Sequence, residues 1–298
     1  MQPQNGQLVM LQRTLKLLIG LALLVQIGAQ AGCTTLVSYT MQGLTDDLSS
    51  AILDSDDIEL VRDGAPAYLI LIDGLVSGSP EDAALLQTAA SLNSAYASAF
   101  IEAPERADRM HSKALELSLR AVCLAIKDGC GIETRPFADY ELWLAGRREK
   151  DVPLLYSLGS SWAGWMQANS DDFNAIAQLS RVKALMQRVA ELDPAYDSGG
   201  VHLYLGVFET LFPPAMGGRP EVGRGHFEQA VALSEGRHLL TKVMFAESYA
   251  RLVFDRDLHD QLLAEVLDAP VREPGLTLMN TVAKSRARTL LEGADEYF

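Results

Sequence analysis

The side chains that most often carry catalysis are present in this sequence, but their spacing matches no familiar catalytic motif. The five histidines, at positions 111, 202, 226, 238 and 259, include no pair four residues apart, the spacing that places two rings on one helix face. There is no nucleophile elbow, phosphate-binding glycine loop, HExxH motif or CxxC pair. We therefore expect a protein that binds other molecules and is not an enzyme, with no cofactor and no metal site.

Two of the three cysteines could react with each other. Cys123 and Cys130 are close enough in the sequence to form a disulfide in an oxidising compartment. The alternative is a pair of buried thiols, because Cys123 lies in an apolar helical run. No histidine or further cysteine lies nearby at ligand spacing, so a metal site is poorly supported. We favour the disulfide by a small margin.

The amino terminus has the pattern of a targeting segment. Basic residues precede an apolar run over residues 17–27, which is too short to cross a bilayer comfortably. The run leads to the sequence Gln-Ala-Gly-Cys33, which resembles the cleavage site of bacterial lipoproteins. We predict that residues 1–32 are a signal peptide and that Cys33 is lipidated, which anchors the protein to a bacterial membrane. Thr34 leaves the choice between inner and outer membrane open, and an ordinary signal peptide is the alternative.

Composition narrows the class of partner. The chain has 298 residues, 48% of them hydrophobic, which is enough for a substantial core. Its formal net charge of −14 would repel phosphate backbones, so we expect no nucleic-acid partner.

Aromatic residues and one loop in the second half are the candidates for a binding site. Core packing explains any one aromatic side chain better than ligand binding does. Taken together with a Met-Gly-Gly loop, they suggest an apolar cavity between helices that could hold an organic anion. A solvated helix face is the simpler explanation for Arg224 and Lys284. The candidate ligand- or partner-binding residues are Tyr156, Trp162, Trp165, His202, Tyr204, Met216, Gly217, Gly218, Arg224, Asn280 and Lys284.

The elements that must position these residues are predicted to be helices. Residues 65–76 form a continuous apolar run that could be a buried strand or a buried helix, and we predict a helix because no partner strand is visible. Acidic residues before apolar runs, as at Asp56-Asp57, suit helix amino termini. Further helices are expected from about residue 79 to 102, onward to about 128, over 137–145, from Asp151 through Trp162, from the cap at 170–172 to Leu192, and over 276–291.

Residues 188–231 organise the rest of the chain. A helix ends before Pro194, a second opens near Tyr196, and a third begins after Gly223, with a loop at residues 212–220 that is too rich in Pro and Gly to be helical. Pairs that contain a small residue, at 92/93, 158/159, 205/206 and 245/246, would let helices pack closely. We therefore predict an all-α fold of tetratricopeptide-like helical hairpin repeats forming a superhelix. It would be a single domain over residues 61–298, after a tether and first helix at 33–60.

Several segments together resemble the T component of tripartite ATP-independent periplasmic (TRAP) transporters. They are Cys33 in its cleavage site, Gly64–Leu69, Asp151–Tyr156 followed by Trp162, Leu192–Pro194 with Gly199-Gly200, Met216–Pro220, and Asn280 followed by Ala283-Lys284. The sequence departs from the repeat pattern at Glu209, where a tetratricopeptide helix usually carries an aromatic residue.

The resemblance implies an all-α, tetratricopeptide-like lipoprotein of the periplasm. It implies a homo-oligomer, a trimer, that docks the periplasmic solute-binding protein (the P component) and passes a small hydrophobic or carboxylate ligand towards a membrane permease. The alternative is a general scaffold lipoprotein for envelope assembly. An enzyme on a helical scaffold ranks last.

Overall fold

The computed structural model of the chain describes residues 48–298, so the expectations for residues 1–47, including the signal peptide and Cys33, lie outside the described residues. The chain divides into two units, residues 1–52 and 53–298. The described residues 48–52 of the first unit are helical. All the elements named below belong to the second unit.

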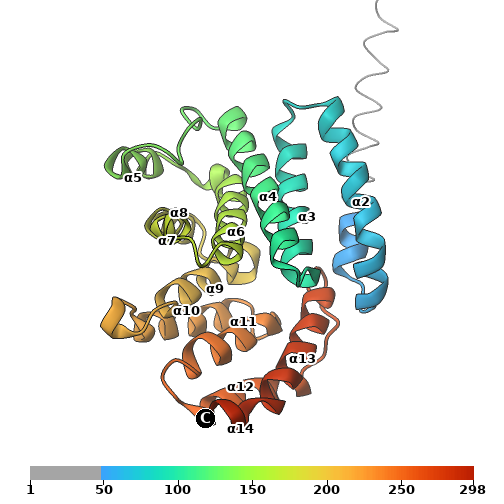
Figure 1. Cartoon of the computed structure of the whole chain (residues 1–298), viewed down its shortest axis with the longest axis vertical. Helices are drawn as coiled ribbons and strands as arrows, with labels where there is room; N and C mark the ends of the chain where they lie inside the picture. Colours follow the sequence, from blue (N-terminus) through green and yellow to red (C-terminus); the bar gives the residue numbers. More distant parts are fainter. Residues whose placement is uncertain (1–47) are drawn as a thin grey trace, which may run out of the picture. The chain divides into compact units, whose positions relative to one another are not determined.

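The second unit is built from helices, and no β-strand occurs between residues 48 and 298 (Figure 1). Residues 65–76 lie inside a helix, which confirms the prediction for that apolar run. The α-helices are α2 Ile58–Gly78, α3 Ala83–Phe100, α4 Pro104–Ala125, α5 Phe137–Ala145, α6 Val152–Ala168, α7 Phe173–Ala177, α8 Leu179–Leu192, α9 Tyr196–Thr210, α10 Pro220–Leu233, α11 Leu239–Met244, α12 Arg256–Asp268, α13 Thr277–Glu292 and α14 Ala294–Tyr297. A π-helical turn, η3 Phe245–Ala250, continues α11.

Local side-chain chemistry explains where many of these helices begin. The carboxylates of Asp57, Asp82 and Asp172 accept hydrogen bonds from free backbone N–H groups at the starts of α2, α3 and α7. Proline occupies the first turn of α4, α6 and α10, where its missing N–H costs nothing. Because Pro220 can start a helix in this way, α10 begins at Pro220. The prediction that this helix begins after Gly223 is therefore wrong.

Two further boundaries differ from the prediction. A single helix was expected from the acidic cluster at 170–172 to Leu192, but the structure has a short α7 followed by α8. The helix expected to open near Tyr196 starts with a left-handed turn, because Asp197, Ser198 and Gly199 have φ angles of 52°, 55° and 81°. Such angles are costly for residues other than glycine, so tertiary contacts must hold this turn.

Small residues bring the helices close together, as the sequence pattern suggested. A Cβ atom added to Gly206 of α9 would lie 2.9 Å from the ring of Phe227 on α10. One added to Gly159 of α6 would lie 2.6 Å from the Cε atom of Met186 on α8. The buried apolar residues form two clusters, one centred on α6 and α8 and one on the π-helical turn, α12 and α13. Helix α9 contributes residues to both clusters.

Candidate functional site

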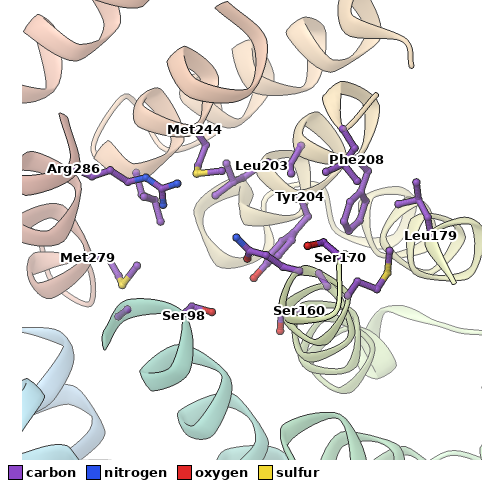
Figure 2. A pocket seen from close by; sticks show the side chains of 18 of the residues that line it. Ser98, Ser160, Ser170, Leu179, Leu203, Tyr204, Phe208, Met244, Met279 and Arg286 are labelled. Atoms are coloured by element: carbon purple, nitrogen blue, oxygen red, sulfur yellow. The ribbon is translucent and has the colours of Figure 1, made fainter. Parts of the chain in front are cut away.

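A cavity of about 470 Å³ lies in the second unit, where side chains from the two apolar clusters face each other. Figure 2 shows Met279 and Arg286 of α13 on one side and Phe208 and Leu179 on the other. Helices α9 and α11 contribute further apolar walls, among them Leu203, Val207, Leu240 and Met244. A hollow of this size with mainly aliphatic, aromatic and methionine side chains suits a small apolar molecule.

Small residues of α6 border part of the cavity. Ser160, Ala163 and Gly164 are small, whereas Met166 and Gln167, in the last turn of the helix, are larger. A Cβ atom on Gly164 would lie 2.5 Å from the Nδ1 atom of His111 on α4. The small residues therefore serve two purposes, since they let α4 pack against α6 and leave space on the cavity side.

Hydroxyl groups form a polar edge on the α6 and α9 side of the cavity. Tyr204 and Ser160 both line the cavity. Burial, together with the nearby Asp197 carboxylate, raises the pKa of Tyr204 to about 12, so the phenol stays protonated. The ring of Tyr204 packs edge-on against Tyr156, whose hydroxyl donates to an Oδ atom of Asp197 at 2.5 Å. This last bond ties the left-handed turn of α9 to α6.

One charged residue borders the cavity among the described residues that line it. Arg286 extends from α13, and its Nη2 atom lies 2.5 Å from the Oε2 atom of Glu247 on the π-helical turn. The arginine and glutamate side chains keep 42% and 27% of their surface exposed. A positive group therefore stands at the solvent-accessible edge of an otherwise uncharged lining.

The predicted site residues do not gather in one place. Tyr204 is the member of the predicted set that lines the cavity. Trp162 is buried in the α6–α8 core, Trp165 packs against that core, and Asn280 is fully buried. The amide of Asn280 accepts from the N–H of Leu239 and donates to backbone carbonyl groups, so it fastens α13 to the start of α11.

The two predicted cations, Lys284 and Arg224, also have structural partners. Lys284 donates to the carbonyl oxygen of Leu267 at 2.7 Å. Arg224 pairs with Glu228 on the exposed face of α10, and the Glu228 carboxylate raises the pKa of the guanidinium. The positive group beside the cavity is therefore Arg286, two residues after Lys284. The signal that could have identified it is the spacing of Met279, Val282 and Arg286, which places all three on one face of α13.

The Pro/Gly loop lies against α9 and is held there by a buried carboxylate. Glu209 is 2% exposed, accepts two hydrogen bonds from Arg219 at 2.5 and 2.9 Å, and pairs with Lys183 at 2.7 Å. Burial alone would raise the pKa of Glu209, but the hydrogen bonds from Arg219 and Lys183 outweigh it and lower the pKa. This network explains why a carboxylate stands at a position where the repeat pattern has an aromatic residue.

The glycines of the loop are required by its path. Gly217 has a φ of 92°, which favours glycine, and a side chain at Gly218 would collide with the carbonyl oxygen of Phe212. Met216 is 68% exposed. Leu211 and Phe212, at the start of the loop, line the cavity. The loop therefore borders the cavity, while Met216 at its tip faces solvent.

The two cysteines and two of the histidines form pairs. Cys123 and Cys130 are joined by a disulfide at the end of α4. His202 and His226 face each other across α9 and α10, a contact that sequence spacing could not reveal.

No group of three or more metal-ligating side chains occurs in the part of the chain that the structure describes. Within residues 48–298, no helix has the length and hydropathy needed to cross a bilayer.

Comparison with known proteins identifies the family of the chain. The family described as TRAP transporter T-component matches residues 54–298. The chain is also similar to an "uncharacterized protein" of Treponema pallidum (strain Nichols), with 22% identity over 273 residues, which cover 85% of this chain and 84% of the relative. The matched family region includes every helix that borders the cavity. The chain therefore belongs to the TRAP transporter T-component family, whose members are accessory components of TRAP-type transport systems.

Proposed function

We propose that this protein is a periplasmic lipoprotein that holds a small hydrophobic or carboxylate ligand in its cavity and docks the solute-binding protein of a TRAP-type system. The observation that carries the proposal is the apolar cavity of about 470 Å³ inside a member of the T-component family. Such a cavity can shelter an apolar ligand from water during transfer between proteins. Cys33 would anchor the protein to the membrane after removal of residues 1–32.

The helical pairs support a repeat architecture for residues 61–298. Helices α3 and α4 pack against each other, as do α9 and α10, and small residues lie at several of the close contacts. We propose that these pairs belong to a tetratricopeptide-like superhelix and that copies of the chain assemble as a trimer. Analytical ultracentrifugation of the protein without its signal peptide tests the trimer.

Ligand binding can be tested with a neutral fluorescent probe such as N-phenyl-1-naphthylamine. The protein should enhance the emission of the probe in a saturable way. Substitution of Ala163 by Trp fills the cavity and should abolish the enhancement, whereas Trp at the exposed Ala67 of α2 should leave it unchanged. Equal enhancement by both variants would show that the probe binds elsewhere.

Partner binding needs a separate test. The protein should co-purify with a periplasmic solute-binding protein from envelope extracts after chemical cross-linking and mass spectrometry. Recovery of cell-wall or outer-membrane assembly proteins in its place would favour the general scaffold function.

The lipid anchor is tested by metabolic labelling with a fatty acid. Labelling should be lost in Cys33→Ser, and persistent labelling would contradict the anchor.

A further inference from the structure

The position of Arg286 is informative beyond the presence of a cavity. Met279, Val282 and Arg286 share one face of α13 and border the cavity. Figure 2 shows Met279 and Arg286 on the same side of the cavity. The guanidinium keeps 42% of its surface exposed and pairs with Glu247, so it stands at the edge of the cavity and is not a buried charge. A cavity for uncharged molecules has no need of such a group.

The partner of Arg286 leaves much of its binding capacity unused. A guanidinium has five N–H donors in a planar fork. Glu247 approaches one terminal nitrogen of Arg286, and no other hydrogen bond or ion pair of Arg286 occurs within residues 48–298. The Oε2 atom of Glu247 is shielded from solvent and makes no well-aligned hydrogen bond, although it lies 2.5 Å from the arginine. The pair is therefore held by charge proximity, and the fork can accept a second carboxylate.

Glu247 is placed by an uncommon backbone element. It lies in the π-helical turn η3, which directly follows the cavity residue Met244. The rings of Phe245 and Tyr249 in the same turn pack against each other, and Phe245 also stacks on Phe227 of α10, so the turn is firmly held. π-Helical turns are rare and are found frequently at functional sites. The backbone therefore fixes an acidic group next to Arg286.

We propose that Arg286 is the anion-recognising residue of the cavity and that the ligand is an amphiphilic carboxylate. The apolar part of the ligand would fill the space between α6, α9 and α13, and its carboxylate would bind the fork of Arg286 at the solvent-accessible edge, in competition with Glu247. This inference rests on the proposed ligand-binding function and adds the class of ligand, its orientation and the residue that selects it. Bidentate pairing with arginine is both stronger and more directional than pairing with lysine.

The test compares two probes of equal chain length, decanoate and decan-1-ol, at a pH where the acid is ionised. Each is titrated into the protein by calorimetry or by displacement of N-phenyl-1-naphthylamine. The unmodified protein should bind decanoate more tightly than decanol by about tenfold or more, because hydrogen bonds to charged groups contribute about 1.5–3 kcal/mol. Arg286→Met should remove this preference and leave decanol binding within about twofold, since the methionine keeps the apolar contacts of the stem.

Three further variants sharpen the result. Arg286→Lys should keep part of the preference for decanoate, because lysine retains the charge without the fork. Glu247→Gln should strengthen decanoate binding by removing the competitor. Arg288→Met changes an exposed arginine on the same helix and should behave as the unmodified protein. Circular dichroism verifies that each variant is folded.

The possible outcomes separate this inference from the function on which it rests. If the unmodified protein binds both probes equally, or if Arg286→Met keeps the preference for decanoate, Arg286 is not the selecting residue, and the cavity remains a site for neutral apolar ligands. If neither probe binds and Ala163→Trp changes nothing, the ligand-binding function itself is wrong.

Discussion

His202 on α9 and His226 on α10 lie with their Nδ1 atoms 3.0 Å apart, and their rings are stacked at a centroid distance of 5.3 Å. One nitrogen must donate and the other accept, so the pair can share a hydrogen bond only while at least one ring is neutral. Burial first, and then His226, lowers the pKa of His202 to about 4. Burial also lowers the pKa of His226, as do Lys183 and Arg219, whereas Glu209 raises it.

This pair predicts a loss of stability in mild acid. In the unfolded chain both histidines would take up protons near pH 6.5, but the folded protein resists protonation until a lower pH. The free energy of unfolding should therefore be insensitive to this pair above about pH 6.5 and should fall as the pH drops from about 6.5 towards 4. Urea denaturation at a series of pH values measures this dependence.

The matching variant is His226→Gln, which should reduce the pH dependence over that range. Some dependence should remain, because burial also lowers the pKa values of His111 and His238. A variant whose stability changed with pH as steeply as that of the unmodified protein would contradict the assignment to this pair.

The buried carboxylate of Glu209 should contribute measurably to stability. Glu209→Gln removes its charge but leaves Arg219 and Lys183, which are 53% and 22% exposed and can turn towards water. We therefore expect the free energy of unfolding to fall by about 1–3 kcal/mol. This is less than the cost of leaving a fully buried cation without a partner. The control Glu228→Gln removes an exposed pair with Arg224 and should cost about 0.5 kcal/mol or less. Equal losses for the two variants in urea denaturation would disprove the importance of burial here.

Alanine substitution at two glycines should change the stability of the protein in opposite directions. Gly206→Ala places a methyl group 2.9 Å from the fully buried ring of Phe227, and overpacking of this kind costs about 1–3 kcal/mol. Gly225, inside α10, has no atom within 4 Å of the added methyl group, so Gly225→Ala should stabilise the helix by up to about 1 kcal/mol. Thermal denaturation would refute the packing account if both variants were stabilised.

The Cys123–Cys130 disulfide closes a short loop after α4. A loop of this size should contribute about 2 kcal/mol by limiting the unfolded chain. The double variant Cys123→Ser, Cys130→Ser should therefore melt at a lower temperature than the oxidised protein, and a reductant should lower the melting temperature of the unmodified protein but not that of the variant. Identical melting curves with and without reductant would show that the bridge does not form in solution.

The sequence by itself determined that the fold is helical, and it located many of the helices and their ends. Asp57 and the Gly217-Gly218 pair act on backbone groups within a few residues of themselves, so their effects can be read locally. The small residues Gly159 and Gly206 predicted close packing, and the family resemblance was confirmed over residues 54–298.

Only the tertiary structure decided which side chains meet. His202 and His226 are 24 residues apart, Glu247 and Arg286 are 39 apart, and the cavity is formed by helices from α3 to α13. Such contacts depend on how each helix is rotated and on which helix it packs against, and neither follows from periodicity along one segment. For this reason the sequence identified Tyr204 of the cavity lining but offered Arg224 and Lys284 as candidate cations. Lys284 binds a backbone carbonyl, two residues before the arginine that borders the cavity.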